Sequence, residues 1–229
     1  MREPVKGKSD AGRAREDRAR ATRQRIVAAA IDLFIEGGYT ATTVDAIAHR
    51  AGVSAATIYQ AFGTKQAVLE RAIDVTLAGD DAPIAVLERA WVNEARQEPD
   101  PGRRLDLIVR GASTIAARVA PLREVLRDAA AVEPGLRALI AEDHRRRHQS
   151  QTALVELLAD NHRLRSPLTP ENAADVFFAL VSSETYQLLV LRRGWTTSEW
   201  QDWLVDTIER ELFDTASKAQ RRSPRADRR

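Results

Sequence analysis

A row of small and hydrogen-bonding side chains follows Ser54, and it is the part of this sequence best suited to specific chemistry. At about 100° per residue, these side chains share the outer side of a short helix, opposite an apolar side of Ile58, Ala61 and Phe62. Methyl groups allow a close approach to a base pair, a hydroxyl and an amide can hydrogen-bond base edges, and a tyrosine hydroxyl can reach a phosphate. Their types and spacing predict a helix that reads DNA. The outer residues are Ala55, Ala56, Thr57, Tyr59 and Gln60.

Such a reading helix needs a second helix to hold it, and residues 44–51 supply one. Thr42, with Asp45 three residues later, predicts the capping box at its start. Gly52 predicts a left-handed residue at its end, since glycine adopts that conformation without steric cost. The apolar face of this helix recurs at i, i+3, i+4 and i+7, in Val44, Ile47, Ala48 and Ala51.

Ser54 and its neighbours fix the angle at which the reading helix leaves the turn. Serine is a favoured N-cap, and Val53 before it with Ile58 after it forms a hydrophobic staple. The two helices therefore form a helix-turn-helix. The alternative is a helical hairpin used only for packing, which has no need of caps, staple and turn glycine together.

The residues on both sides of this motif extend the pattern over residues 20–70. The matching positions are residues 22–34, 37–39, 42–44, 47–48, 51–54, 57–59, Phe62 and Lys65. They resemble the N-terminal domain of tetracycline-repressor-type (TetR-family) regulators. The resemblance implies a three-helix DNA-binding head, an all-helical body that binds a ligand and dimerises, and release of DNA when a small molecule binds.

One departure from the resemblance concerns the two positions after the capping serine. Many members carry Lys, Arg, Gly or Pro there, whereas this chain has Ala55 and Ala56. Base reading is therefore expected to rest on apolar contact and on Thr57 and Gln60. Lys65 opens a fourth helix, where a cation opposes the helix dipole, and a phosphate contact explains that cost. The predicted DNA-contacting residues are Thr42, Thr43, Ser54, Ala55, Ala56, Thr57, Tyr59, Gln60 and Lys65.

Composition predicts an all-α protein. At 229 residues and 44% hydrophobic content the chain can bury a sizeable core, and alanine, leucine, glutamate and arginine favour helix. With no cysteine, a disulfide framework and a thiolate metal site are excluded. No apolar stretch is expected to reach the ~18 residues of a membrane span, and the N-terminus lacks a signal core. We therefore expect a cytoplasmic protein.

Helix-breaking residues, helix caps and the distribution of charge divide the chain into four parts. We expect a disordered basic arm over residues 1–17, a DNA-binding domain over 18–64, a helical regulatory and dimerisation domain over 65–213, and a disordered basic tail over 214–229. The arm either enters the minor groove or only aids solubility. Helices are predicted over residues 18–36, 83–97, 103–119, 121–131, 135–162, 170–193 and 197–213.

The last two helices predict a dimer. The helix from Pro170 is apolar nearly all round, so a second chain should cover one side of it. The last helix opens with a capping box of Thr196 and Glu199, and with a staple of Trp195 on Trp200. Both suit a four-helix bundle across a two-fold axis. The predicted interface residues are Phe177, Phe178, Val181, Trp200, Trp203 and Leu204.

The helix from Gly135 turns polar midway along its apolar stripe, at Asp143, Arg147 and Gln151. One explanation is that this stretch is solvated or lies at a wet edge of the dimer. The other is that it faces a ligand cavity, in which a few polar groups orient the ligand among apolar walls. The predicted ligand site has walls of Trp91, Ile108 and Ile115, and hydrogen bonds from His144 and Gln151.

The sequence gives little support for a catalytic site or a metal site. His144 and His148 are four residues apart, but three arginines fill the gap and disfavour a cation. Nucleotide-binding and serine-hydrolase motifs are absent from the sequence. We therefore expect no enzyme, no metal and no cofactor. The predicted function is a homodimeric repressor, released from a pseudo-palindromic operator in double-stranded DNA by an unknown small molecule. The alternatives are a ligand-binding protein with a vestigial helix-turn-helix and a nonspecific DNA coater.

Overall fold

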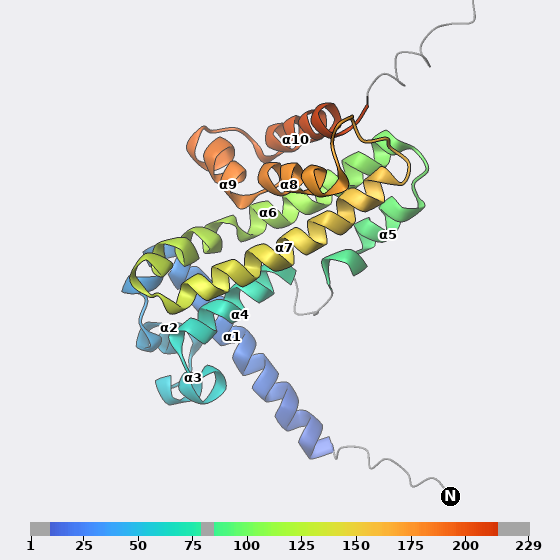
Figure 1. Cartoon of the computed structure of the whole chain (residues 1–229). Coiled ribbons are helices and arrows are strands. Elements are labelled where there is room, and N and C mark those ends of the chain that lie inside the picture. Colours follow the sequence, from blue (N-terminus) through green and yellow to red (C-terminus); the bar gives the residue numbers. More distant parts are fainter. Residues whose placement is uncertain (1–9, 79–84, 215–229) are drawn as a thin grey trace, which may run out of the picture. The chain divides into compact units, whose positions relative to one another are not determined.

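The computed structural model describes residues 10–78 and 85–214, and these are helical with no strand among them (Figure 1). An isolated antiparallel bridge joins Leu164 to Phe213. The predicted all-α class is therefore confirmed. The α-helices are α1 (Asp10–Ala41), α2 (Val44–Ala51), α3 (Ala55–Phe62), α4 (Lys65–Ala78), α5 (Ala90–Gln97), α6 (Pro101–Val132), α7 (Gly135–Ala159), α8 (Pro170–Leu180), α9 (Ser183–Tyr186) and α10 (Thr197–Leu212). A 3₁₀ turn (Val86–Glu88) precedes α5, and a π-helical segment (Gln187–Arg192) follows α9.

Two compact units divide the chain differently from the expected border after residue 64. The first, the head unit, runs to Asp74 and includes Glu124–Leu136; the second, the body unit, comprises Val75–Arg123 and the chain from Arg137 onward. The first turns of α4 and the last turns of α6 thus belong with the head. In the head unit, the Tyr39 hydroxyl donates to Glu133 Oε2 over 3.0 Å, across 94 residues of sequence.

An apolar core brings together the helices of the head unit. The Phe34 and Tyr39 rings stack with centroids 5.6 Å apart. Burial of such side chains, rather than helix propensity, supplies most of the stability of short helices such as α2 and α3. The fully buried members are Ile26, Ala30, Phe34, Ile47, Val68, Leu69 and Ala72.

Helix α1 begins earlier than predicted, at Asp10 rather than near residue 18. Residues 10–17 are therefore helical instead of forming a disordered arm, because alanine, arginine and glutamate are strong helix formers. Residues 1–9 of the predicted arm lie outside the described residues. Gly38, two residues beyond the predicted helix end at residue 36, interrupts the regular helix with a φ of 77°, a positive value that glycine adopts without steric cost.

The helices predicted over 103–119 and 121–131 form a single helix, α6, that continues through Pro121. Proline removes one backbone hydrogen bond, and the expected cost led to the prediction of two helices. Its neighbours Ala120 and Leu122 are at most 1% exposed, and their burial offsets that cost. The predicted helix over 83–97 is also wrong, since extended Arg89 separates the 3₁₀ turn from α5 and residues 83–84 lie outside the described chain.

The helix predicted over 170–193 is broken where α8 ends. Ser182 has extended backbone angles, and its hydroxyl accepts from the Thr185 N–H over 3.2 Å. The Thr185 hydroxyl in turn donates to the Leu180 carbonyl over 2.8 Å. These hydroxyls satisfy the backbone groups that the break would otherwise leave unpaired. Contrary to expectation, Pro170–Arg192 is long and apolar enough to cross a membrane by length and composition alone, but it is not one continuous α-helix.

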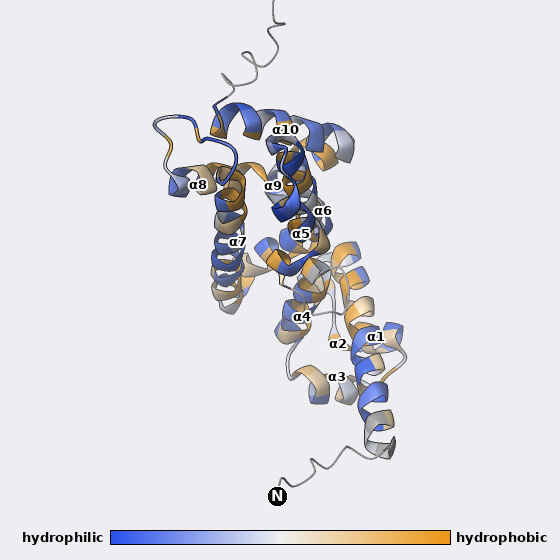
Figure 2. Cartoon of the chain, turned by 90° about the vertical axis from the view of Figure 1, so that its right-hand side faces the viewer, coloured by the Kyte–Doolittle hydropathy of each residue, from blue (hydrophilic) through white to orange (hydrophobic). Residues whose placement is uncertain are grey.

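The final helix, α10, begins as predicted. The Thr196 hydroxyl accepts from the Glu199 N–H, and the Glu199 carboxylate accepts from the Thr196 N–H, which confirms the capping box. The Trp195 ring packs edge-on against the Trp203 ring, at 6.2 Å between centroids, and Trp195 also packs against the core cluster that contains Trp200. The staple of Trp195 on Trp200 stays a prediction. Figure 2 shows that α7, in the same body unit, is hydrophilic in its middle and apolar towards both ends. The predicted tail beyond residue 214 lies outside the described residues.

Candidate functional site

The helix-turn-helix starts one residue later than predicted. Thr43, not Thr42, is the N-cap of α2, since its hydroxyl accepts from the Ala46 N–H over 3.1 Å. Thr42 is only 4% exposed, and its hydroxyl lies 2.8 Å from the Gly38 carbonyl that the end of α1 leaves free. A buried hydroxyl needs such an acceptor, so the predicted DNA contact of the Thr42 side chain is corrected.

The turn between α2 and α3 is held by the predicted signals. Gly52 is left-handed, with φ 66° and ψ 41°, and the Val53 N–H donates to the Ala48 carbonyl over 3.0 Å. The Ser54 hydroxyl caps α3 by accepting from the Thr57 N–H over 3.2 Å. These contacts are local in sequence, and they aim α3.

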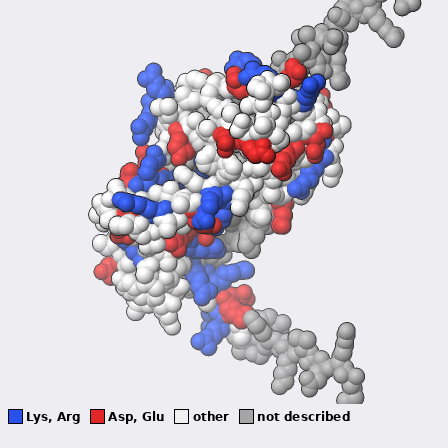
Figure 3. Space-filling view, in the orientation of Figure 1, with Lys and Arg blue, Asp and Glu red and all other residues white. Residues whose placement is uncertain are grey.

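The outer side of α3 is exposed and uncharged. Ile58, on the inner side, is 1% exposed, which turns Ala56, Tyr59 and Gln60 towards solvent. The Tyr59 side chain is prominent, since the residue is 54% exposed. Figure 3 shows no Lys or Arg over this part of the molecule. Ala55 and Thr57 are partly buried at the flanks of the face.

Lys65 joins the end of α1 to the start of α4. Its ammonium donates to the backbone carbonyls of Tyr39 and Thr42, over 3.0 and 3.1 Å, and lies 4.0 Å from the centre of the Tyr39 ring. Two of its three hydrogens are thereby used inside the head unit. Burial, followed by the hydrogen bond to Glu133, raises the pKa of Tyr39. The phosphate contact of Lys65 stays a prediction.

Basic side chains follow one another along the first half of α1 (Figure 3). Residues 10–17 were predicted as part of a loose arm and residues 18–36 as a helix, but the structure carries the arginines of both parts on one helix, which begins at Asp10. Arg50 of α2 is neutralised by Glu36 of α1, with 2.8 Å between Nη1 and Oε1, and this pairing lowers the pKa of Glu36. The exposed arginines of α1 are Arg15, Arg18, Arg20, Arg23 and Arg25.

The predicted ligand residues do not come together. Trp91 and Ile115 line a pocket of about 350 Å³ between α5 and α6. Ile108 is 0% exposed in the core, and exposed His144 packs edge-on against the Phe178 ring. Gln151 is 6% exposed and donates to the Val181 carbonyl over 3.1 Å. The other residues around the pocket are Arg89, Asp106, Leu107, Arg110, Gly111, Thr114 and Arg118.

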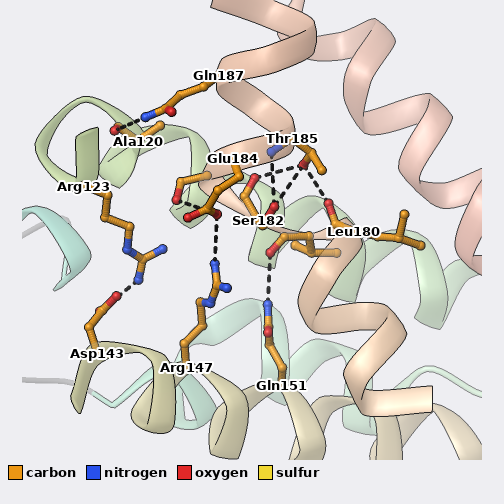
Figure 4. A network of polar contacts seen from close by, with 12 residues as sticks. Ala120, Arg123, Asp143, Arg147, Gln151, Leu180, Ser182, Glu184, Thr185 and Gln187 are labelled. Carbon is orange, nitrogen blue, oxygen red and sulfur yellow. Dashed lines mark hydrogen bonds and ion pairs between the residues drawn. The ribbon is translucent and has the colours of Figure 1, made fainter. Parts of the chain in front are cut away.

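The polar stripe of α7 is buried, so its explanation as a solvated surface is wrong (Figure 4). Asp143 is 8% exposed and accepts from Arg123 Nη2 over 2.9 Å. The Arg147 side chain is 12% exposed and pairs with Glu184 at 3.6 Å. Sequence reasoning missed Arg123 and Glu184. Arg123 could have been recognised as inward-facing from its spacing, because it lies four residues after Val119, on the same side of α6, and Val119 is buried.

Four of the predicted dimer residues lie in the core of their own chain. Phe177, Val181, Trp200 and Leu204 are at most 1% exposed, so they have no surface to offer a partner. The continuous-helix prediction caused this error, because the break after α8 changes which side chains point outward. Phe178 and Trp203 keep partial exposure. Leu188 and Leu191 of the π-helical segment, which the sequence prediction did not select, are each 54% exposed.

Comparison with known proteins agrees with the fold and with the helix-turn-helix. An uncharacterised HTH-type transcriptional regulator of Bacillus subtilis, YdeS, is 36% identical over 108 residues, which are 47% of this chain and 46% of that protein. The match therefore spans about half of that relative's length. A regulator from Saccharomonospora viridis, solved in complex with choline, is 21% identical with a TM-score of 0.64 over 84% of this chain and 97% of its own. FadR from Bacillus subtilis, solved with stearoyl-CoA, is 19% identical with a TM-score of 0.65 over 81% and 96%.

The similarity to a known family lies in the part of the chain that forms the head unit. Residues 26–72 match the bacterial regulatory proteins of the tetR family. This range runs from the first buried residue of α1, through the helix-turn-helix, to the buried face of α4. Over residues 26–72 this chain is therefore similar to the bacterial regulatory proteins of the tetR family.

Proposed function

We propose that this chain is a sequence-specific DNA-binding regulator of transcription, and that it acts as a homodimeric repressor released from its operator by a small molecule. The observation that carries the proposal is the exposed, uncharged outer face of α3, held by a capped turn. Such a face suits the major groove, where base edges differ in donors, acceptors and methyl groups. A cytoplasmic location goes with this activity.

The side chains of α3 would divide the DNA contact between them. Ala55 and Ala56 offer methyl groups, Thr57 and Gln60 offer hydrogen bonds to base edges, and the Tyr59 hydroxyl reaches a phosphate. Thr43 and Ser54 would stand beside the backbone at the two N-caps. Since α3 carries no charge, phosphate neutralisation would come from elsewhere, and the exposed arginines of α1 are the candidates.

Ligand response is supported by the two structural relatives solved with choline and with stearoyl-CoA.

Dimerisation is supported by apolar side chains that the body unit leaves exposed. Leu188 and Leu191 are large apolar residues of the body unit that are each 54% exposed, and Phe178 and Trp203 are partly exposed. A two-fold dimer would read a pseudo-palindrome whose half-sites lie about 34–36 Å apart, or a multiple of that spacing.

Selection of DNA by the purified protein, followed by gel shifts at two salt concentrations, tests this proposal. We expect an inverted repeat to emerge and to survive competition by random DNA. A protein that binds all sequences equally would be a nonspecific coater instead. A protein that binds no DNA at either salt concentration would be a ligand-binding protein with a vestigial helix-turn-helix.

A further inference from the structure

Two buried arginines of the body unit have hydrogen-bond donors that nothing around them accepts. Arg123 is 7% exposed, and only its bond to Asp143 is short, at 2.9 Å. Arg147 Nη1 lies 3.6 Å from Glu184 Oε2, which is beyond hydrogen-bond length. Within the described chain, Arg123 Nε and Arg147 Nε and Nη1 are buried without a hydrogen-bond partner. Buried donors in folded proteins are nearly always paired, so these three need an acceptor.

An aromatic wall stands beside the unpaired donors. The Arg147 guanidinium lies 3.8 Å from the centre of the Phe178 ring, and His148 packs against the same ring at 5.5 Å. On the next turn of α7, Gln151 donates to Val181 and its Oε1 is buried without a partner among the described residues. A charged group with an apolar wall and a single amide is the composition of a ligand site.

We propose that the small-molecule effector carries a carboxylate on an apolar body, and that this carboxylate binds Arg147 and Arg123 in place of Glu184. The inference rests on the ligand response proposed above. In this structure, the Glu184 carboxylate lies beside Arg147, where the acid group of the effector would bind. Figure 4 shows the arrangement, with Arg147 reaching from α7 towards Glu184 and Arg123 reaching from α6 towards Asp143.

Charge balance favours a carboxylate. Two guanidinium groups face two carboxylates, so exchanging Glu184 for a singly charged acid leaves the net charge of the cluster unchanged. A doubly charged phosphate would add a buried negative charge, which is costly without a partner. Burial, followed by repulsion from Arg123, lowers the pKa of Arg147 to about 10, which is what a cation short of acceptors should show.

Glu184 is also the member of the cluster that can leave. Its side chain is 49% exposed, so its carboxylate returns to water at little cost. It lies in the first turn of α9, directly after the break at Val181 and Ser182, and Gln151 holds the Val181 carbonyl. Displacement of Glu184 would therefore act on the junction between α8 and α9.

The variant Glu184→Gln tests the site, because it removes the internal competitor and leaves two buried arginines facing one carboxylate. The matched control is Glu142→Gln, whose carboxylate is similarly exposed and pairs with Arg145 and Arg146 on the outer side of α7. We expect sodium acetate to raise the Tm of Glu184→Gln more than that of Glu142→Gln at equal ionic strength. We expect benzoate to bind Glu184→Gln at least about tenfold more tightly than wild type, and neutral benzamide at least about tenfold more weakly than benzoate.

Two further variants address Arg147 itself. Arg147→Gln should abolish benzoate binding, and Arg147→Lys, which keeps the charge but loses the planar fork, should weaken it about tenfold. Equal acetate responses of Glu184→Gln and Glu142→Gln would overturn the inference. So would equal affinities for benzoate and benzamide, or benzoate binding that survives both Arg147 variants. If the Arg147 variants fail to fold, the acetate comparison alone decides.

Operator binding, measured on the same proteins without a probe, separates this inference from the proposed function. Both Glu184→Gln and Glu142→Gln should keep wild-type operator affinity. A chain that shows the acetate response but has no operator preference would overturn the proposed function and leave the carboxylate site standing. A chain that binds its operator but shows no acetate response overturns only the site.

Discussion

At the residue scale, base reading and affinity should lie on different side chains. Gln60 is exposed on α3 and offers both a donor and an acceptor, whereas Tyr59 offers one hydroxyl at the end of a long ring. The helix between its caps has no charge to attract phosphate. Substitutions on α3 should therefore separate sequence preference from general DNA affinity.

Gln60→Ala should relax the preference at one or two base pairs, because a bidentate amide contact is worth about 1–3 kcal/mol of discrimination. Binding to a panel of operators with single base changes measures it. Tyr59→Phe is the control, since loss of a phosphate contact weakens all sequences alike. If Gln60→Ala weakened operator and random DNA equally, the base contact would be wrongly assigned.

Asp143→Asn should leave the Arg123 guanidinium buried without a compensating charge. Removal of one partner of a buried ion pair costs about 3–5 kcal/mol of unfolding free energy, whereas the exposed pair in the control Glu142→Gln contributes about 0–1 kcal/mol. Urea unfolding measures both variants. Losses of similar size in the two proteins would mean that the Arg123–Asp143 pair is solvated rather than buried.

Side chains whose partners are near in sequence were predictable, and those with distant partners were not. Ser54 and Gly52 act within four residues, so their roles follow from the local order of types. Thr42 was misassigned by one position because two adjacent threonines can each cap, and only the burial of one decides. The Tyr39–Glu133 bond spans 94 residues and has no local signal.

At the element scale, helix ends were predictable and interruptions were not. The capping box of α10 is formed by Thr196 and Glu199, which are only three residues apart in the sequence. The break after α8 depends on the hydroxyls of Ser182 and Thr185, which are also compatible with an uninterrupted helix. The sequence was therefore consistent with both a broken and a continuous helix. The continuity of α6 through Pro121 depends on burial that only the fold supplies.

Gly52→Ala tests the turn that aims α3. A Cβ in the left-handed conformation costs about 1–2 kcal/mol, so the melting temperature and the operator affinity should both fall. Gly37→Ala is the matched control, since its Cβ would meet only Ala41 Cβ at 4.0 Å within helix α1. Alanine there should be neutral or stabilising by up to about 1 kcal/mol. An unchanged melting temperature for Gly52→Ala would contradict the strained turn.

At the scale of the whole molecule, the proposed dimerisation requires apolar side chains that the fold leaves exposed. The sequence predicted a dimer through residues 170–213, but four of the six interface residues that it selected are used in the chain's own core. A pattern of apolar residues does not say which of two apolar faces a chain buries in itself. Leu188 and Leu191 are therefore better candidates for the seam.

The double variant Leu188→Glu and Leu191→Glu should be monomeric in sedimentation velocity, because it brings charges into an apolar seam. Its operator affinity should fall steeply, since two half-sites are no longer bound as one unit. Val132→Glu is the control, as another exposed apolar residue, 64% exposed and on α6. A double variant that stays dimeric with full operator affinity would place the seam elsewhere.

If the exposed face of α3 reads a specific operator, the protein must distinguish that operator from other DNA of the same length. The most direct measurement is the ratio of dissociation constants for the selected inverted repeat and for a scrambled duplex of equal length, taken at physiological salt. We expect a ratio of at least about 10³ in favour of the inverted repeat. A ratio near one would overturn the proposed base reading. It would mean that the head unit binds DNA through its charged residues alone and that the uncharged face of α3 reads no sequence.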